Sequence, residues 1–162
     1  MNTASHDQEA IEKVRELIKG INIAMLTTVS DEGLVSRPMK TQDVEFDGNL
    51  WFITKKDTGK FHELLRNRQV NAAYAGKSFV SIRGEAELVE SVDKLKEFWN
   101  PVYEELLETS YDDPNLVLIQ VKAETAEYWD PGNKFKMAKF LFRRLLGKNT
   151  EGTDMNRIVE LS

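Results

Sequence analysis

Two short segments of the sequence carry residues that could bind an anion. In FITKKDTGKFHELL (52–65), Thr54 and Thr58 precede Lys60, which lies in the first turn of a helix predicted over 59–69. Free backbone N–H groups and the helix dipole favour negative charge at that end, so a lysine there is locally unfavourable unless an anion compensates it. We interpret Thr54, Thr58 and Lys60 as a candidate anion site, and the alternative is a solvated turn.

The second segment is SRPMK (36–40), which places Arg37 within a predicted strand. The planar guanidinium suits bidentate contact with a phosphate. The alternative is an arginine whose charge protects an edge strand from aggregation. The neighbouring Pro38 cannot donate to a strand ladder, so it predicts an edge, bulged or interrupted strand.

Other patterns in the sequence do not support nucleotide hydrolysis or metal chemistry. An ATP-type phosphate loop ending at Lys60 would need glycine at Thr54 and a hydroxyl residue at Phe61. His6 and His62 are far apart in the sequence, and neither has a cluster of partner residues. We therefore expect no metal site and no histidine-activated nucleophile.

Composition limits the class of protein further. The 162 residues suit a single domain, and the absence of cysteine removes disulfides and thiolate catalysis. A net charge of −5 argues against a dedicated nucleic-acid binder. No basic leader precedes an apolar run, and no apolar stretch approaches the ~18 residues that span a membrane. We expect a cytoplasmic protein with no nucleic-acid or membrane partner.

The apolar patterns predict strands with helices between them. A helix is predicted to end near Gly20. Strands are predicted to follow it over 22–30, 34–46, 49–54, 70–76, 79–90 and 115–130. Gly84 suggests a bend in the strand over 79–90. Helices are expected over 91–109, broken before Pro101, and over 133–148, where a basic amphipathic pattern favours packing on the domain or a partner.

These elements predict a mainly β fold, a small antiparallel β-barrel with peripheral helices. The alternative is an open antiparallel sheet with helices on one face. We expect one domain over 1–148, which includes the terminal helices, and a flexible tail over 149–162.

The ordered set of segments resembles the pyridoxamine 5′-phosphate oxidase-like flavoproteins, and among them the general stress protein 26 group. The resemblance covers about Ile11 to Trp129. It is carried by AMLTTVSDEGLVSRPM (24–39), LWFITKKDTGKFHELLRNRQVNAAY (50–74), FVSIRGEAELV (79–89) and EYWD (127–130). The family implies a split β-barrel and a homodimer that holds FMN in two clefts at the subunit interface.

The resemblance also implies roles for particular residues. The FMN phosphate would be bound by Arg37, Thr54, Thr58 and Lys60. Residues Pro38, Met39 and Ile53 would lie along the flavin and present backbone donors and acceptors to the ring edge. Finally, Ser81 and Trp129 would complete the cleft across the dimer.

The function implied is an FMN-dependent oxidoreductase with NAD(P)H as a candidate electron donor and a role in redox stress. FAD or a deazaflavin is an alternative cofactor, because the residues that would bind the phosphate do not distinguish these cofactors from FMN. Vitamin B6 oxidation is not expected, since that activity uses a C-terminal histidine and none follows His62. The alternative function is a non-catalytic flavin or haem carrier on the same barrel, and no catalytic residue is assigned.

Overall fold

The computed structural model describes residues 3–42, 45–130, 141–147 and 156–162. Its strands are β1 (Ile23–Ser30), β2 (Gly33–Lys40), β3 (Asn49–Lys55), β4 (Gln69–Ala75), β5 (Phe79–Val89), β6 (Leu116–Trp129) and β7 (Asn156–Glu160). Its helices are α1 (Thr3–Ile18), α2 (Gly59–Arg66), α3 (Val92–Phe98) and α4 (Pro101–Leu107), and residues 141–145 are also helical. Within these ranges, no helix has both the length and the apolar character needed to cross a membrane.

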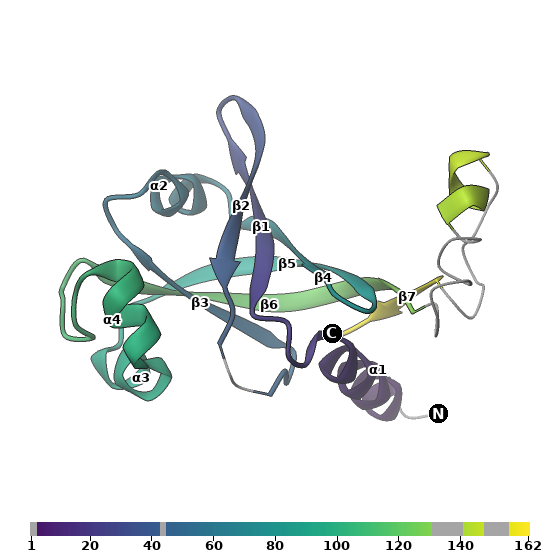
Figure 1. Ribbon diagram of the computed structural model, residues 1–162, viewed down its shortest axis with the longest axis horizontal. Coiled ribbons are helices and arrows are strands. Elements are labelled where there is room, and N and C mark those ends of the chain that lie inside the picture. The colour runs from purple at the N-terminus through teal and green to yellow at the C-terminus, as the bar shows by residue number, and fades with distance from the viewer. Residues whose placement is uncertain (1–2, 43–44, 131–140, 148–155) are drawn as a thin grey trace.

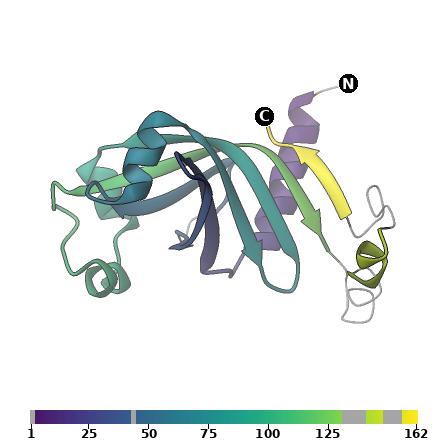
Figure 2. The same ribbon diagram turned by 90° about the horizontal axis from the view of Figure 1, so that it is seen from above.

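The strands form one curved antiparallel sheet that does not close (Figures 1 and 2). Their order is β2-β1-β4-β5-β6-β3, and β7 pairs with the later half of β6 beside β3. The two end strands, β2 and β3, approach one another without pairing. The predicted class, a mainly β split barrel with peripheral helices, is confirmed, and the opening between β2 and β3 is the split.

Two apolar clusters lie on opposite faces of β3 and β6. The larger includes Leu26, Phe52 and Ile82 and is covered by α1. The smaller includes Ile53 and Leu118 and is covered by α3 and α4, which Figure 1 shows at the other end of the molecule from α1. Successive residues of a strand point to opposite faces, so β3 is buried on both sides and reads as a continuous apolar run.

The bend predicted at Gly84 is a break in the β5–β6 register. The pairing shifts between Arg83 and Gly84. A Cβ atom at Gly84 would lie 2.3 Å from the carbonyl oxygen of Lys122, so only glycine fits at this approach of two backbones. The bulge lets the long strands β5 and β6 bend around the larger cluster.

Two prolines mark element boundaries as the sequence predicts. Pro38 lies in β2, which is an end strand of the sheet. Pro101 is the first residue of α4, and α3 ends before it at Phe98. Asn100 caps α4, because its Oδ1 accepts a hydrogen bond from the Val102 backbone at 2.9 Å.

The end of the chain differs from the prediction. A flexible tail is predicted over 149–162, but residues 156–160 form β7 against β6. Asn156 is fully buried and donates to Glu127 Oε1 at 3.0 Å and to the Tyr128 carbonyl at 3.3 Å, and Leu161 is also buried. The prediction is therefore wrong for 156–160. Residues 149–155, and the part of the predicted 133–148 helix other than 141–147, lie outside the described residues.

Helix α2 links the two sides of the split. It follows β3 through a short turn, yet it packs against β1, the neighbour of β2. Consequently the end of β3, the start of α2 and the middle of β2 come together although they are separated in the sequence. The candidate anion residues lie in these three segments.

Candidate functional site: an anion site at the split

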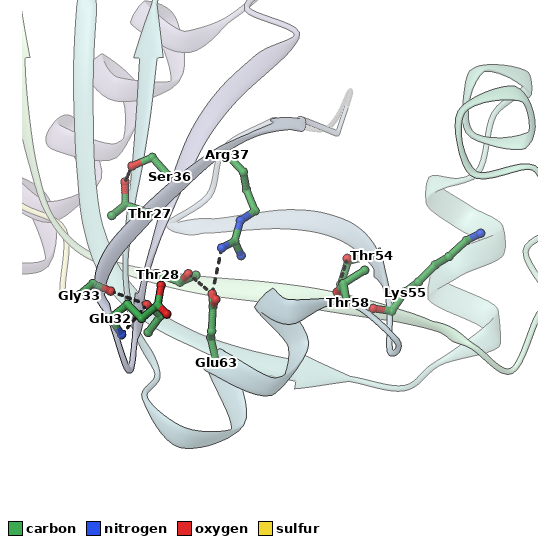
Figure 3. Close-up of polar contacts among 11 residues, drawn as sticks. Thr27, Thr28, Glu32, Gly33, Ser36, Arg37, Thr54, Lys55, Thr58 and Glu63 are labelled. Atoms are coloured by element: carbon green, nitrogen blue, oxygen red, sulfur yellow. Dashed lines mark hydrogen bonds and ion pairs between the residues drawn. The ribbon is translucent and has the colours of Figure 1, made fainter.

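A cluster of charged and hydroxyl side chains lies where α2 approaches β1 and β2 (Figure 3). Arg37 Nη2 on β2 donates to Glu63 Oε2 on α2 at 3.0 Å, and Thr28 Oγ1 on β1 donates to the same oxygen at 2.5 Å. Thr28 is fully buried, and the Arg37 and Glu63 side chains expose only 21% and 18% of their surface. The ion pair is largely removed from water and ties α2 to the end strand.

The environment of Glu63 keeps its carboxyl group ionised. The hydrogen bond from Thr28 contributes most to lowering the pKa of Glu63; burial acts in the opposite direction, and Arg37 lowers the pKa further through its hydrogen bond and charge. Glu63 is therefore a carboxylate at neutral pH. Its role is to hold Arg37, and it has no proton to donate.

Lys60 brings a second positive charge to the cluster. Burial contributes most to lowering the pKa of Lys60, and the charge of Arg37 lowers it further, while Glu63 raises it. Two cations share one carboxylate here, so Arg37 and Lys60 count +2, Glu63 counts −1, and the three groups carry a net charge of +1. A second anion would relieve the repulsion that disfavours the charged form of Lys60.

One guanidinium nitrogen of Arg37 is unsatisfied. Arg37 Nη1 is buried and has no hydrogen-bond partner among the described residues. Leaving a buried donor unpaired costs about 1–3 kcal/mol, and more for a charged group. Such a donor in a native structure calls for an acceptor that the protein itself does not supply.

The two threonines lie beside the start of α2, as Figure 3 shows. Thr58 is the N-cap residue, but its side chain makes no capping bond; its Oγ1 donates instead to the Lys55 carbonyl at 2.7 Å. The hydroxyl oxygens of Thr54 and Thr58 lie 3.4 Å apart. The first N–H groups of α2 therefore lack a side-chain acceptor and favour an anion. The structure thus brings Arg37, Thr54, Thr58 and Lys60 to one region.

The residues expected along the flavin ring lie on the two end strands that border the split. The side chains of Met39 and Ile53 are buried, Met39 in the larger cluster and Ile53 in the smaller one. Since β2 and β3 are end strands, each keeps one edge whose N–H and C=O groups have no strand partner among the described residues. Pro38, with no N–H, removes one donor from the β2 edge.

Ser81 and Trp129 do not join the Arg37 cluster within one chain. Register places Arg37, Leu26 and Ala72 in one row on the inner face of the sheet. Ser81 precedes the buried Ile82 on β5, so its side chain points to the outer face, where it accepts a hydrogen bond from Asn71 at 2.8 Å. Trp129 pairs with Phe79 on that same outer face.

Sequence reasoning missed Glu63 and Thr28. The available signal for Glu63 is its position three residues after Lys60 on a predicted helix, where the two side chains are neighbours. No local pattern marks Thr28, because its contact with Glu63 joins residues 35 positions apart.

The fold and the site together define a split-barrel protein with a cluster of net positive charge at its opening. The family model of pyridoxamine 5′-phosphate oxidase like proteins matches residues 9–152. The chain therefore belongs to the pyridoxamine 5′-phosphate oxidase-like family.

Several of the proteins that this chain resembles are described as general stress proteins. General stress protein 26 of Bacillus subtilis (strain 168) is 25% identical over 136 residues, which cover 80% of this chain and 94% of the relative. The crystal structure of general stress protein 26 from Bacillus anthracis has a TM-score of 0.65 and 25% identity, with 74% of this chain and 93% of that chain covered. A general stress FMN/FAD binding protein from Xanthomonas citri has a TM-score of 0.64 and 29% identity, with 75% and 89% covered.

We expect Thr28→Val to raise the pKa of Glu63, because it removes the hydrogen bond that contributes most to lowering it. The measurement is a carbon-13 NMR titration of the Glu63 carboxyl in ligand-free protein. Because the pKa of Glu63 is lowered by folding, its contribution to stability is present above the unfolded-chain pKa and is lost as pH falls through the folded pKa. The stability advantage of the wild type over Thr28→Val should therefore shrink on acidification.

Thr27→Val is the matched control, since the Thr27 hydroxyl lies against Ser36 Oγ at 2.5 Å and makes no contact with Glu63. An unchanged pKa of Glu63 in Thr28→Val, or an equal change in both variants, would contradict this description of the cluster.

Proposed function

We propose that this protein binds FMN, with the phosphate at the Arg37–Lys60 cluster. The observation that supports this most is the buried, unpartnered Nη1 of Arg37, which lies in a cluster with a net positive charge. A phosphate monoester brings three acceptor oxygens and a charge of about −1.5 to −2 near pH 7. It could accept from Arg37 Nη1, from Lys60 and from the first N–H groups of α2.

The split between β2 and β3 suits the flavin ring. A flavin needs an apolar slot and a few backbone hydrogen bonds at its edge, and the unpaired strand edges beside Met39 and Ile53 offer these groups. The similarity to the Xanthomonas citri FMN/FAD binding protein supports the same class of ligand. The cluster would equally bind the ribityl phosphate of FAD.

We expect Arg37→Ala and Lys60→Ala each to weaken FMN binding about 10- to 100-fold, because a hydrogen bond to a charged group contributes about 1.5–3 kcal/mol. Riboflavin, which lacks the phosphate, should bind nearly as well to the variants as to the wild type. The measurement is quenching of flavin fluorescence. Lys56→Ala is the matched control, because Lys56 lies on the same turn but pairs with Glu90.

Unchanged FMN affinity in both variants would mean that the phosphate does not bind at this cluster. A loss of riboflavin affinity as large as the loss of FMN affinity would do the same, because it would mean that the substitutions disturb the ring site or the fold.

A homodimer completes the proposed site. The outer face of the sheet exposes large apolar side chains, among them Ile23 (52% exposed), Met25 (41%) and Phe79 (37%). In the strand register, Met25 pairs with Ala73, Ala73 pairs with Ser81, and Phe79 pairs with Trp129. Ser81 and Trp129, the two residues expected to act across the dimer, therefore lie on this face. Large exposed apolar side chains gathered on one face of a sheet are typical of an interface between proteins.

Met25→Glu should convert the dimer to a monomer, because it places a charge at the centre of the apolar face. Sedimentation velocity at micromolar concentration measures the change. Val92→Glu is the control, since Val92 is also exposed (55%) but begins α3, away from this face. A wild type that sediments as a monomer, or a Met25→Glu variant that stays dimeric, would contradict this interface.

We propose that the bound flavin makes the protein an oxidoreductase, with NAD(P)H as the electron donor. The carboxylate of the cluster, Glu63, is held by Thr28 and Arg37, so the cluster supplies binding and the flavin supplies the redox chemistry. A cluster that supplies only binding also favours the second candidate, a flavin carrier without turnover.

The two candidates differ in NAD(P)H consumption by the FMN-loaded protein. An oxidoreductase should bleach its flavin absorbance when NAD(P)H is added under nitrogen and recover it with an electron acceptor. Arg37→Ala should abolish this activity at low FMN concentration. A flavin that stays oxidised in the presence of both NADH and NADPH would exclude these donors and support the carrier, and a Soret band on adding haem would favour haem over flavin.

A further inference from the structure

A cavity lies beside α1, away from the Arg37–Lys60 cluster. Its volume is about 430 Å³, and the residues that line it come from the C-terminal half of α1, from β3 and β4, and from the segments on either side of residues 43–44. Its apolar lining is Ile18, Ile21, Phe46, Leu50, Trp51 and Tyr74. This volume is within the range of small-molecule sites.

The cavity is separate from the phosphate cluster. Its nearest lining residues are Thr41 beyond the end of β2, four residues after Arg37, and Trp51 on β3, three residues before Thr54. At about 3.3 Å per residue, these intervals span roughly 13 Å and roughly 10 Å. None of the residues that line the cavity belongs to the Arg37–Glu63–Lys60 cluster.

Tyr74 gives the cavity an unused hydrogen-bond donor. Its side chain is 3% exposed, and the part of the chain that the structure describes offers no partner to its hydroxyl. Burial raises the pKa of Tyr74, so the hydroxyl stays protonated at neutral pH. Buried tyrosine hydroxyls usually find a partner. The cavity that Tyr74 lines is the space in which an acceptor could lie.

The charges around the cavity do not select an ion of either sign. Glu12, Glu16 and Glu45 are negative, and Arg15 and Lys19 are positive. Arg15 is already engaged, because its Nε donates to the Phe46 carbonyl at 2.8 Å. Oppositely charged groups at one rim largely cancel at a distance, so the apolar lining and the Tyr74 hydroxyl define the ligand.

We propose that this cavity is a binding site for a neutral aromatic compound with one carbonyl acceptor, which the Tyr74 hydroxyl recognises. The rings of Phe46, Trp51 and Tyr74 provide the apolar contact, since aromatic side chains bind flat rings by stacking and edge contacts. The inference does not rest on the flavin proposal, because it uses different residues.

The test uses the naphthyl ketone 6-propionyl-2-(dimethylamino)naphthalene, a neutral fluorophore whose emission shifts to the blue in apolar surroundings, and its analogue with propyl in place of propionyl. Wild-type protein should bind the ketone with a blue shift. Tyr74→Phe should weaken ketone binding about two- to tenfold, the range for one hydrogen bond, and leave the propyl analogue unaffected. Tyr111→Phe, at the α3–α4 end of the molecule, should leave both affinities unchanged.

The stability of the ligand-free protein separates recognition from a structural role. Because the Tyr74 hydroxyl makes no hydrogen bond to the residues that the structure describes, the Tm of Tyr74→Phe should equal or exceed that of the wild type. A Tm several degrees lower, an equal loss for both probes, or no binding of the ketone would each overturn the proposal. Competitive displacement of the ketone by FMN would also overturn it, since both ligands would then share one site.

Discussion

The ion pair between Arg37 and Glu63 is the interaction on which the candidate site depends. Arg37 comes from the end strand β2 and Glu63 from α2, so the pair joins the two sides of the split. A partly buried charge is costly unless it is paired, and removing either partner would leave the other exposed to that cost. Glu63 neutralises only one of two cations, and the remaining positive charge, with the free Nη1 of Arg37, is what the site offers to an anion.

The open sheet explains why the site lies where it does. A closed barrel would pair the edges of β2 and β3 and leave no backbone groups for a planar ligand. Here the glycine bulge at Gly84 bends the long strands, and α2 covers one side of the resulting opening. The cationic cluster and the unpaired strand edges are therefore two parts of one feature. Thr28 supports the cluster, because its hydrogen bond keeps Glu63 ionised and the ionised carboxylate holds Arg37 in place.

Local patterns in the sequence predicted much of this fold and part of the site. Turn glycines, the alternation along 79–90 and the prolines at 38 and 101 are local signals, and each corresponds to an element boundary, strand or bend in the structure. The Glu63 contacts and β7 were not predictable in this way, because both depend on pairing between segments distant in the sequence. The unpartnered hydroxyl of Tyr74 is likewise visible only once the surrounding side chains are placed.

The most direct test of the central claim is the ionisation of the bound phosphate, followed by phosphorus-31 NMR of FMN-loaded protein between about pH 5 and pH 8. Free phosphate monoesters take up a proton near pH 6. If Arg37 and Lys60 hold the phosphate, its resonance should stay at the dianion position well below that pH, and Lys60→Ala should move the transition back toward the free value. A bound phosphate that titrates as free FMN does would contradict the account.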